Sequence, residues 1–208
     1  MSSRRPSPWC FAAGTALAVV VASPAHAQTR LDLIPFIGSY YATSPLGLQA
    51  ANSEERHENQ AAIGAALFVR LSQTLGIEGS FAYTPSGTNI TSDIDSVANR
   101  GFSGNIIFAD ARVRFWFPRT NLYALAGAGI VSRGGEAWDF PNTTELTNVA
   151  GVAGFGVQAE VSPKVRVDLK IEVHVYSVDP DGDGTTYESK TVADILATVG
   201  VPIKLIGR

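Results

Sequence analysis

Charged and aliphatic side chains alternate along the segment Val165–Tyr176. Because successive side chains of a β-strand point to opposite faces, this spacing places all the polar residues on one face. Charges of both signs at such spacing could relay protons, line a selective pore or neutralise one another as ion pairs. The polar members before Tyr176 are Arg166, Asp168, Lys170, Glu172 and His174.

Other alternating segments contribute further charges to their polar faces. These residues are Arg70, Glu78, Asp110, Arg112, Arg114, Glu160, Asp194 and Lys204. Leaving His174 aside, the combined set is balanced between basic and acidic side chains. Buried charges are tolerated only when they are paired and hydrogen-bonded. We therefore predict a charge network that fills the lumen of a barrel, with a proton path or a pore lining as the alternatives.

Other kinds of chemistry find little support in the sequence. Cys10 is the single cysteine and directly precedes the N-terminal apolar run, which leaves no thiol or disulfide farther along the chain. His174 lies two residues from Glu172 on the same face, but no nucleophile accompanies them. The sequence therefore predicts neither an enzyme nor a cofactor.

One acidic segment resembles the start of a calcium-binding loop. Its carboxylates alternate with residues that allow a tight turn, but counting twelve positions from Asp179 reaches Lys190 rather than the expected bidentate glutamate. The three candidate metal ligands are Asp179, Asp181 and Asp183.

Eight segments have the length and alternation of strands and position these residues. They are Leu31–Tyr41, Ala61–Ser72, Leu75–Thr84, Asn105–Phe117, Leu122–Ser132, Val149–Val161, Val165–Tyr176 and Val192–Leu205. Long polar connections, such as Pro85–Ser103 and Arg133–Asn148, alternate with short turns. The predicted fold class is all-β, an eight-stranded antiparallel up-and-down transmembrane β-barrel, in which short turns lie on the periplasmic side.

The facing of the apolar side chains separates this barrel from a soluble, lipocalin-like barrel that carries a ligand. A soluble barrel places its charges outside, whereas a membrane barrel turns aliphatic residues toward lipid. Tyrosines near the long loops (Tyr40, Tyr41, Tyr83, Tyr176) and aromatics at one short turn (Phe115, Trp116, Phe117, Tyr123) predict two interfacial girdles. The residues predicted to face lipid are Ile63, Leu67, Val113, Val167, Leu169 and Ile171.

The first residues have the features of a secretory signal. Arg4 and Arg5 precede an apolar run, and Ser23–Ala27 supplies small residues for cleavage. We expect residues 1–27 to be a cleaved signal peptide and residues 28–208 to form the barrel. Loss of the two arginines takes the formal charge from −3 to −5, which argues against nucleic acid as a partner.

The predicted barrel is similar to a known group of proteins. Through the opening Leu33–Tyr41 and the small-residue stretch Ala126–Gly129, the chain resembles small outer-membrane β-barrel proteins of Gram-negative bacteria, the OmpA-like transmembrane domains and OmpX/Ail-type barrels. The resemblance implies a location in the outer membrane with both termini in the periplasm. It also implies contact with outer-membrane lipid and with the barrel-insertion machinery.

Three functional classes remain open from the sequence. The first is a structural or interaction barrel that presents loops outside the cell for adhesion or envelope integrity. The second is a narrow channel or small-solute transporter, and the third is an enzyme at the barrel rim. A lumen of eight strands has room for little besides side chains, which favours the interaction barrel with an extracellular partner at its loops.

The closing seam carries a proline on each side. Pro35 and Pro202 lie in the first and last predicted strands, and each removes one hydrogen-bond donor. We therefore predict faster amide exchange near Leu33 and Ile203 than near Val167.

Overall fold

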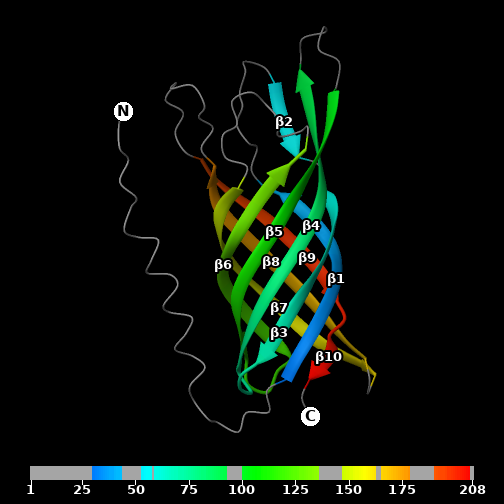
Figure 1. Ribbon diagram of the computed structural model, residues 1–208, viewed down its shortest axis with the longest axis vertical. Coiled ribbons are helices and arrows are strands. Elements are labelled where there is room, and N and C mark those ends of the chain that lie inside the picture. The colour runs from blue at the N-terminus through cyan, green and yellow to red at the C-terminus, as the bar shows by residue number, and fades with distance from the viewer. Residues whose placement is uncertain are drawn as a thin grey trace, which may run out of the picture.

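The protein is all-β in a computed structural model that describes residues 30–43, 53–57, 59–92, 100–135, 147–162, 165–178 and 190–206. Alternation of aliphatic with small or polar residues produces long strands that curve into a closed barrel (Figure 1). Among these residues, no helix is long and apolar enough to cross a membrane.

Ten strands form one antiparallel sheet. They are β1 (Arg30–Ala42), β2 (Ser53–His57), β3 (Gln60–Arg70), β4 (Leu75–Ser92), β5 (Arg100–Trp116), β6 (Leu122–Gly134), β7 (Thr147–Ser162), β8 (Val165–Val178), β9 (Lys190–Gly200) and β10 (Ile203–Ile206). Eight of them, β1 and β3–β9, make the wall, which confirms the predicted eight-stranded barrel.

The barrel closes where the first strand meets the last. Tyr40 pairs with Leu196 in β9, whereas Leu33 pairs with Ile203 in β10. The single strand predicted over Val192–Leu205 is therefore divided, because Val201 and Pro202 lie outside the ladder. The Val201 amide donates to the Pro35 carbonyl over 3.1 Å, so one hydrogen bond spans the interruption. We call the pairing of β1 with β9 and β10 the seam. Its ladder has a gap at Val201 and Pro202, and its register shifts at the end of the barrel, between Leu31 and Asp32.

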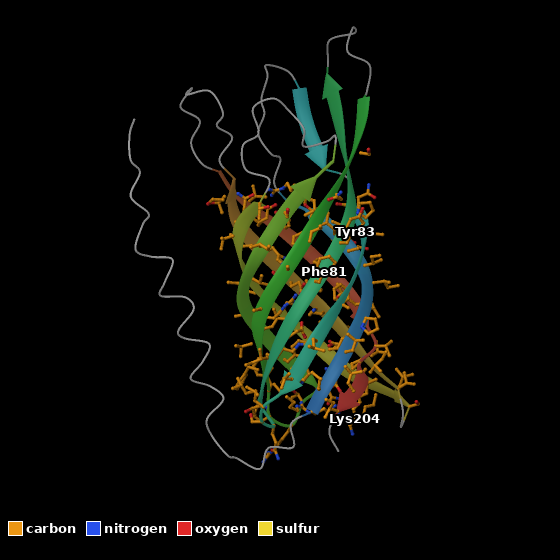
Figure 2. The ribbon with its side chains drawn as sticks, viewed as in Figure 1. Phe81, Tyr83 and Lys204 are labelled. Carbon is orange, nitrogen blue, oxygen red and sulfur yellow. The ribbon has the colours of Figure 1, made fainter. Side chains whose placement is uncertain are left out.

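The outer wall is aliphatic, as the alternation predicts. Ile63, Leu67, Val113, Leu169 and Ile171 are exposed on it, and Val167 is half-buried. Phe81 and Tyr83 project from the same outer surface (Figure 2).

The predicted aromatic girdles are only partly correct. Tyr41, Tyr83, Phe115 and Phe117 are exposed on the outer wall. By contrast, Tyr40, Trp116, Tyr123 and Tyr176 are buried inside the barrel, because their positions have the inward parity of their strands.

The connection predicted over Pro85–Ser103 is wrong in its extent. β4 continues to Ser92 and β5 begins at Arg100, so the hairpin rises beyond the rest of the wall (Figure 1). β2 lies within the predicted first loop and pairs with the extension of β4, from Ser53↔Ser92 to His57↔Thr88. β2 and the extended parts of β4 and β5 are mostly polar and show no regular apolar alternation. The hydrophobic periodicity that predicts the other strands therefore gives no signal there.

Candidate functional site: the charged interior of the barrel

The middle of the lumen holds eight ionisable side chains that contact one another. They project inward from β4, β5 and β8, and each is buried. We call them the central charge cluster: Glu78, Asp110, Arg112, Arg114, Asp168, Lys170, Glu172 and His174. In the sheet order, β6 and β7 separate β5 from β8, so contacts between β5 and β8 cross the lumen.

Arg112 binds carboxylates from three strands. Its guanidinium contacts Asp110 over 3.0 Å (Nη2 to Oδ2) and Glu78 over 3.6 Å (Nε to Oε1). It also donates a hydrogen bond to Glu172 across the lumen. A planar guanidinium with five donors suits such a position, because several carboxylates can be satisfied by one buried cation.

Arg114 forms the second crossing of the lumen. Its Nη1 donates to Oδ2 of Asp168 over 2.7 Å, and its Nη2 is paired with Glu78. The hydroxyl of Tyr123 donates to the other oxygen of Asp168, and the Arg114 guanidinium lies 4.5 Å from the centre of the Tyr123 ring. Gln158 adds a longer hydrogen bond to Asp168, at 3.4 Å.

Lys170 and His174 complete the cluster from β8. The Lys170 ammonium lies 3.2 Å from both Glu78 and Glu172. His174 Nε2 lies 3.2 Å from Oδ2 of Asp110, and its ring packs 4.6 Å from that of Phe108. The closest carboxylate of His174 is therefore supplied by β5 across the lumen, whereas the sequence drew attention to Glu172 on the same strand.

Glycines on β6 and β7 leave room for these long side chains. Gly127 pairs with Arg112, and a Cβ added there would lie 2.6 Å from the Arg112 Cα. Gly154 pairs with Glu172, and its Cβ would lie 2.8 Å from the Glu172 Cα. Both contacts are closer than a Cβ tolerates, so these two positions require glycine where the strand lies close to the paired strand that carries the charge.

A second polar group lies toward the long-connection end. The Tyr176 hydroxyl donates to Asp194, and Arg133 donates to the Asn148 side-chain oxygen over 2.8 Å. Arg133 also lies 4.6 Å from the centre of the Tyr176 ring. The strand alternation predicts Asp194 in the lumen but assigns Arg133 to the connection Arg133–Asn148. Extending the alternation of β6 by two residues, through Val131, would have identified Arg133 as inward-facing.

The remaining predicted lumen residues lie near the short-turn end. Arg70 is half-buried and lies 4.7 Å from the centre of the Trp116 ring, while Arg166 is 3.7 Å from Asp32. Glu160 and Lys204 are exposed, so their predicted place in the buried charge network is wrong, although Glu160 still lines the open end of the lumen. Lys204 lies at the base of the barrel in β10 (Figure 2). Strand alternation predicts which face of the sheet a side chain lies on, but not whether the residue lies beyond the end of the lumen.

One subset of the cluster has the donor types of a metal site. Ligand atoms of Asp110, Glu172 and His174 all lie within 4.8 Å of one another. The Arg112 guanidinium contacts both carboxylates, however, and Lys170 lies against Glu172, so positive charge already occupies the space between them. The calcium-loop candidates Asp179, Asp181 and Asp183 lie outside the described residues.

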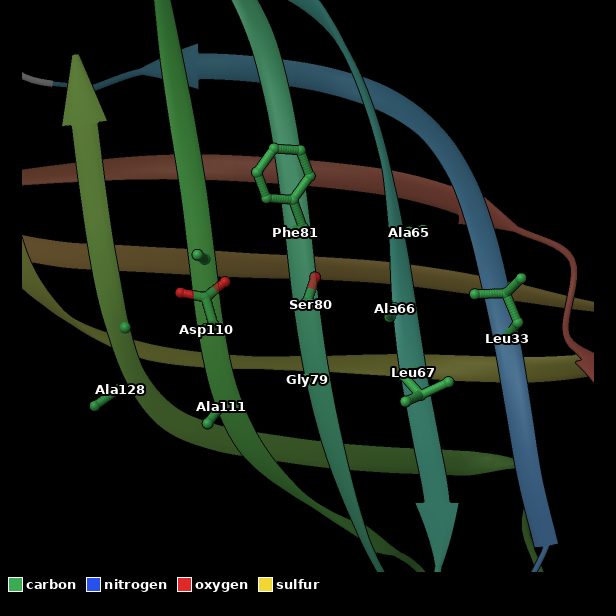
Figure 3. A pocket seen from close by; sticks show the side chains of 12 residues that line it. Leu33, Ala65, Ala66, Leu67, Gly79, Ser80, Phe81, Asp110, Ala111 and Ala128 are labelled. Atoms are coloured by element: carbon green, nitrogen blue, oxygen red, sulfur yellow. The ribbon is translucent and has the colours of Figure 1, made fainter. Parts of the chain in front are cut away.

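The outer wall carries a shallow apolar depression of about 670 Å³. Gly79 lies in it, where an added Cβ would meet nothing within 4 Å, and Leu33, Leu67 and Phe81 stand around it (Figure 3). Small residues of neighbouring strands, together with Asp110, complete its lining.

Comparisons with known proteins agree with this architecture. Residues 13–195 match the model of the outer membrane protein beta-barrel domain. Among curated protein sequences, none matches significantly.

Solved structures with the same fold include OprG from Pseudomonas aeruginosa, with a TM-score of 0.53 at 9% identity, covering 86% of this chain and 97% of OprG. AlkL, solved in lipid bilayers, gives 0.54 at 12% identity, covering 100% and 99%. Neisserial surface protein A gives 0.50 at 12% identity, covering 86% and 98%. At these identities the likeness concerns the fold alone.

Proposed function

The chain belongs to the outer membrane protein beta-barrel domain family, and from this premise we propose that it is an interaction barrel, closed to solutes, that displays its long connections outside the cell. The observation that carries the proposal is the double crossing of the lumen by Arg112–Glu172 and Arg114–Asp168. Both arginine side chains are fully buried, and each is held by several carboxylates.

A lumen occupied in this way is a poor path for solutes. Opening it would require the ion pairs to separate, which leaves unpaired charges in a confined space and costs several kcal/mol. We assign the cluster a structural role: it fills and holds the barrel. Catalysis is no part of the proposal, since no nucleophile accompanies His174 among the described cluster residues.

The proposed orientation places the short turns and both ends of the barrel in the periplasm. The start of β1 and the end of β10 lie together at the short-turn end (Figure 1), and family architecture has short turns on that side. The β4–β5 hairpin, joined by β2, then rises outward as a three-stranded ribbon. Outer-membrane lipid surrounds the wall, and the barrel-insertion machinery places it there.

Planar-bilayer recording tests the closed lumen directly. Purified protein should give no steady large conductance, whereas a double variant Arg112→Ala, Arg114→Ala that still folds should conduct. A gel-mobility difference between unheated and boiled samples would establish that the variant is folded. Steady, large channels from the unmodified protein would contradict the closed barrel and favour the alternative, a narrow channel or small-solute transporter.

The ribbon is tested by shortening it. A variant in which a tight turn replaces residues 86–104 keeps the wall below Pro85↔Asn105 intact. Adhesion of cells that display either form to a panel of immobilised glycans and matrix proteins should fall for the shortened hairpin. Equal adhesion of the two forms to every surface would remove the ribbon from the proposal.

A further inference from the structure

The short-turn end of the lumen opens into a cavity of about 350 Å³ that the central charge cluster does not fill. Its wall includes three arginines from separate elements: Arg70 at the end of β3, Arg119 in the turn after β5, and Arg166 near the start of β8. Among the described residues that line it, Glu160 is the only carboxylate. The cavity is therefore rich in positive charge, in contrast to the central charge cluster, where four carboxylates accompany three permanent cations and His174.

Arg70 is held in place without an ion pair among the described residues. Its guanidinium lies over the Trp116 ring at 4.7 Å, and its Nε is buried with no hydrogen-bond partner. Trp116 lines the cavity as well. A guanidinium fixed on an aromatic face loses little conformational freedom when it binds, and its planar fork matches an oxyanion.

Arg166 is only partly neutralised. Its nearest carboxylate is Asp32, at 3.7 Å from Nη2 to Oδ2, while the other oxygen of Asp32 lies 2.7 Å from Arg30 Nε. Asp32 is thus shared, and its shorter contact is with Arg30. Side-chain amides of Asn121 and Gln158 on the cavity wall can donate further hydrogen bonds.

We propose that this cavity binds a phosphate-bearing group, with Arg70 and Arg166 as its main ligands and Trp116 as the floor beneath Arg70. The positive charge and volume suit a small phosphorylated molecule. That group could be a free solute or the headgroup of an anionic lipid. The cavity lies at the opposite end of the barrel from the ribbon. Its binding of phosphate can therefore be tested independently of the proposed interaction function.

Trp116 provides the measurement. The full chain carrying Trp9→Phe and Trp138→Phe retains Trp116 as its single tryptophan. After refolding in a zwitterionic detergent, titration with inorganic pyrophosphate at constant ionic strength should give a saturable change in Trp116 emission. Arg70→Gln and, separately, Arg166→Gln should each weaken the apparent affinity at least tenfold.

Lys204→Gln is the matched control, because it removes one positive charge from an exposed residue at the same end. The affinity of this variant should match that of the parent. Equal weakening by Lys204→Gln, or no saturable change in the parent, would overturn the proposal. Gel mobility verifies that each variant is folded before titration.

Lipid composition distinguishes the two sources of phosphate. In phosphatidylcholine vesicles pyrophosphate should bind as in detergent. If phosphatidylglycerol vesicles suppress that binding in the parent, the lipid headgroup occupies the cavity; undiminished binding assigns it to a free solute. Both results support a phosphate site, whereas loss of binding in both kinds of vesicle contradicts it.

Discussion

Two groups of strands stabilise the barrel by different means. One is the charged strands β4, β5 and β8, and the other is the seam formed by β1, β9 and β10. β4, β5 and β8 supply all the charges of the central charge cluster, and the β4–β5 ladder runs without a break from Leu75↔Phe115 to Ile90↔Arg100. The seam has a proline on each side and a register break. Its inward residues are mainly apolar, among them Ile34, Phe36 and Leu196.

The difference shows how electrostatic and apolar packing divide a narrow lumen. Each buried cation of the cluster needs carboxylates on another strand, so the cluster links strands that are not hydrogen-bonded neighbours. The Lys170 ammonium also lies 5.3 Å from the centre of the Phe36 ring, which is where the two regions meet. We expect the charged strands β4, β5 and β8 to be more sensitive to substitution, and the seam to be more mobile.

Removal of Arg112 should have the largest effect. Arg112→Ala leaves Asp110 without its guanidinium partner and removes the crossing to Glu172, so we expect the free energy of unfolding to fall by about 3–5 kcal/mol. Urea unfolding of the barrel in phospholipid vesicles measures it. A loss below about 1 kcal/mol would mean that water replaces the guanidinium and that the cluster does not hold the wall together.

A charge on the outer surface of β8 should lower the free energy of unfolding by somewhat less. Ile171 lies midway along β8 on the outer surface, and Ile171→Arg should lower the unfolding free energy by about 2–4 kcal/mol if lipid surrounds it. Val165→Arg, at the first residue of the strand, should cost about 0–1 kcal/mol because it lies near the interface. Equal costs at the two positions would contradict a bilayer centred on the barrel.

Amide exchange should reveal the weaker seam. The Leu33↔Ile203 pair adjoins the gap in the ladder at Val201 and Pro202. Val167 pairs with Ala159 in a ladder without such a gap, although its register shifts between Glu160 and Ser162. We expect amides at Leu33 and Ile203 to exchange about tenfold faster than that of Val167, as local openings are cheapest where hydrogen bonds are interrupted. Hydrogen exchange followed by NMR measures each site. Uniform protection would show that the apolar packing compensates for the prolines.

The smallest effect is expected at Lys204, the predicted lumen residue that lies exposed at the base. Lys204→Ala should change the unfolding free energy by no more than about 0.5 kcal/mol, since exposed substitutions away from special contacts are nearly neutral. The same urea titration applies. A loss comparable to that of Arg112→Ala would restore Lys204 to the charge network.

Periodicity was sufficient to predict the eight strands of the barrel and most of their faces, but not the partners across the lumen. Outward Leu67 and inward Arg112 follow from a period of two, which each strand carries in its own sequence. The contact of Arg114 with Asp168 depends on how β5 and β8 are staggered around the closed barrel, which no single strand encodes. For the same reason the spacing along β8 indicates Glu172 as the neighbour of His174, whereas the short contact of His174 is with Asp110.

The ends of strands were harder to predict for a different reason. Apolar alternation ceases beyond Pro85, although backbone pairing in the β4–β5 hairpin continues to Ile90↔Arg100. At Glu160 the parity remains inward while the lumen has already opened to solvent.

The two ladders also differ in how much chain must be ordered before each can form. The β4–β5 hairpin joins Ile90 to Arg100, residues that are close in sequence, so its loop closes at a low entropic cost. The seam joins Tyr40 to Leu196, nearly the two ends of the barrel, and cannot form until the intervening strands are aligned. The other hairpins, such as β7–β8 at Ser162↔Val165, are equally local, so folding should start at such hairpins and finish at the seam. Until that last step, β1 and β9 each expose an unpaired edge, the state in which the barrel is most prone to mispairing and proteolysis.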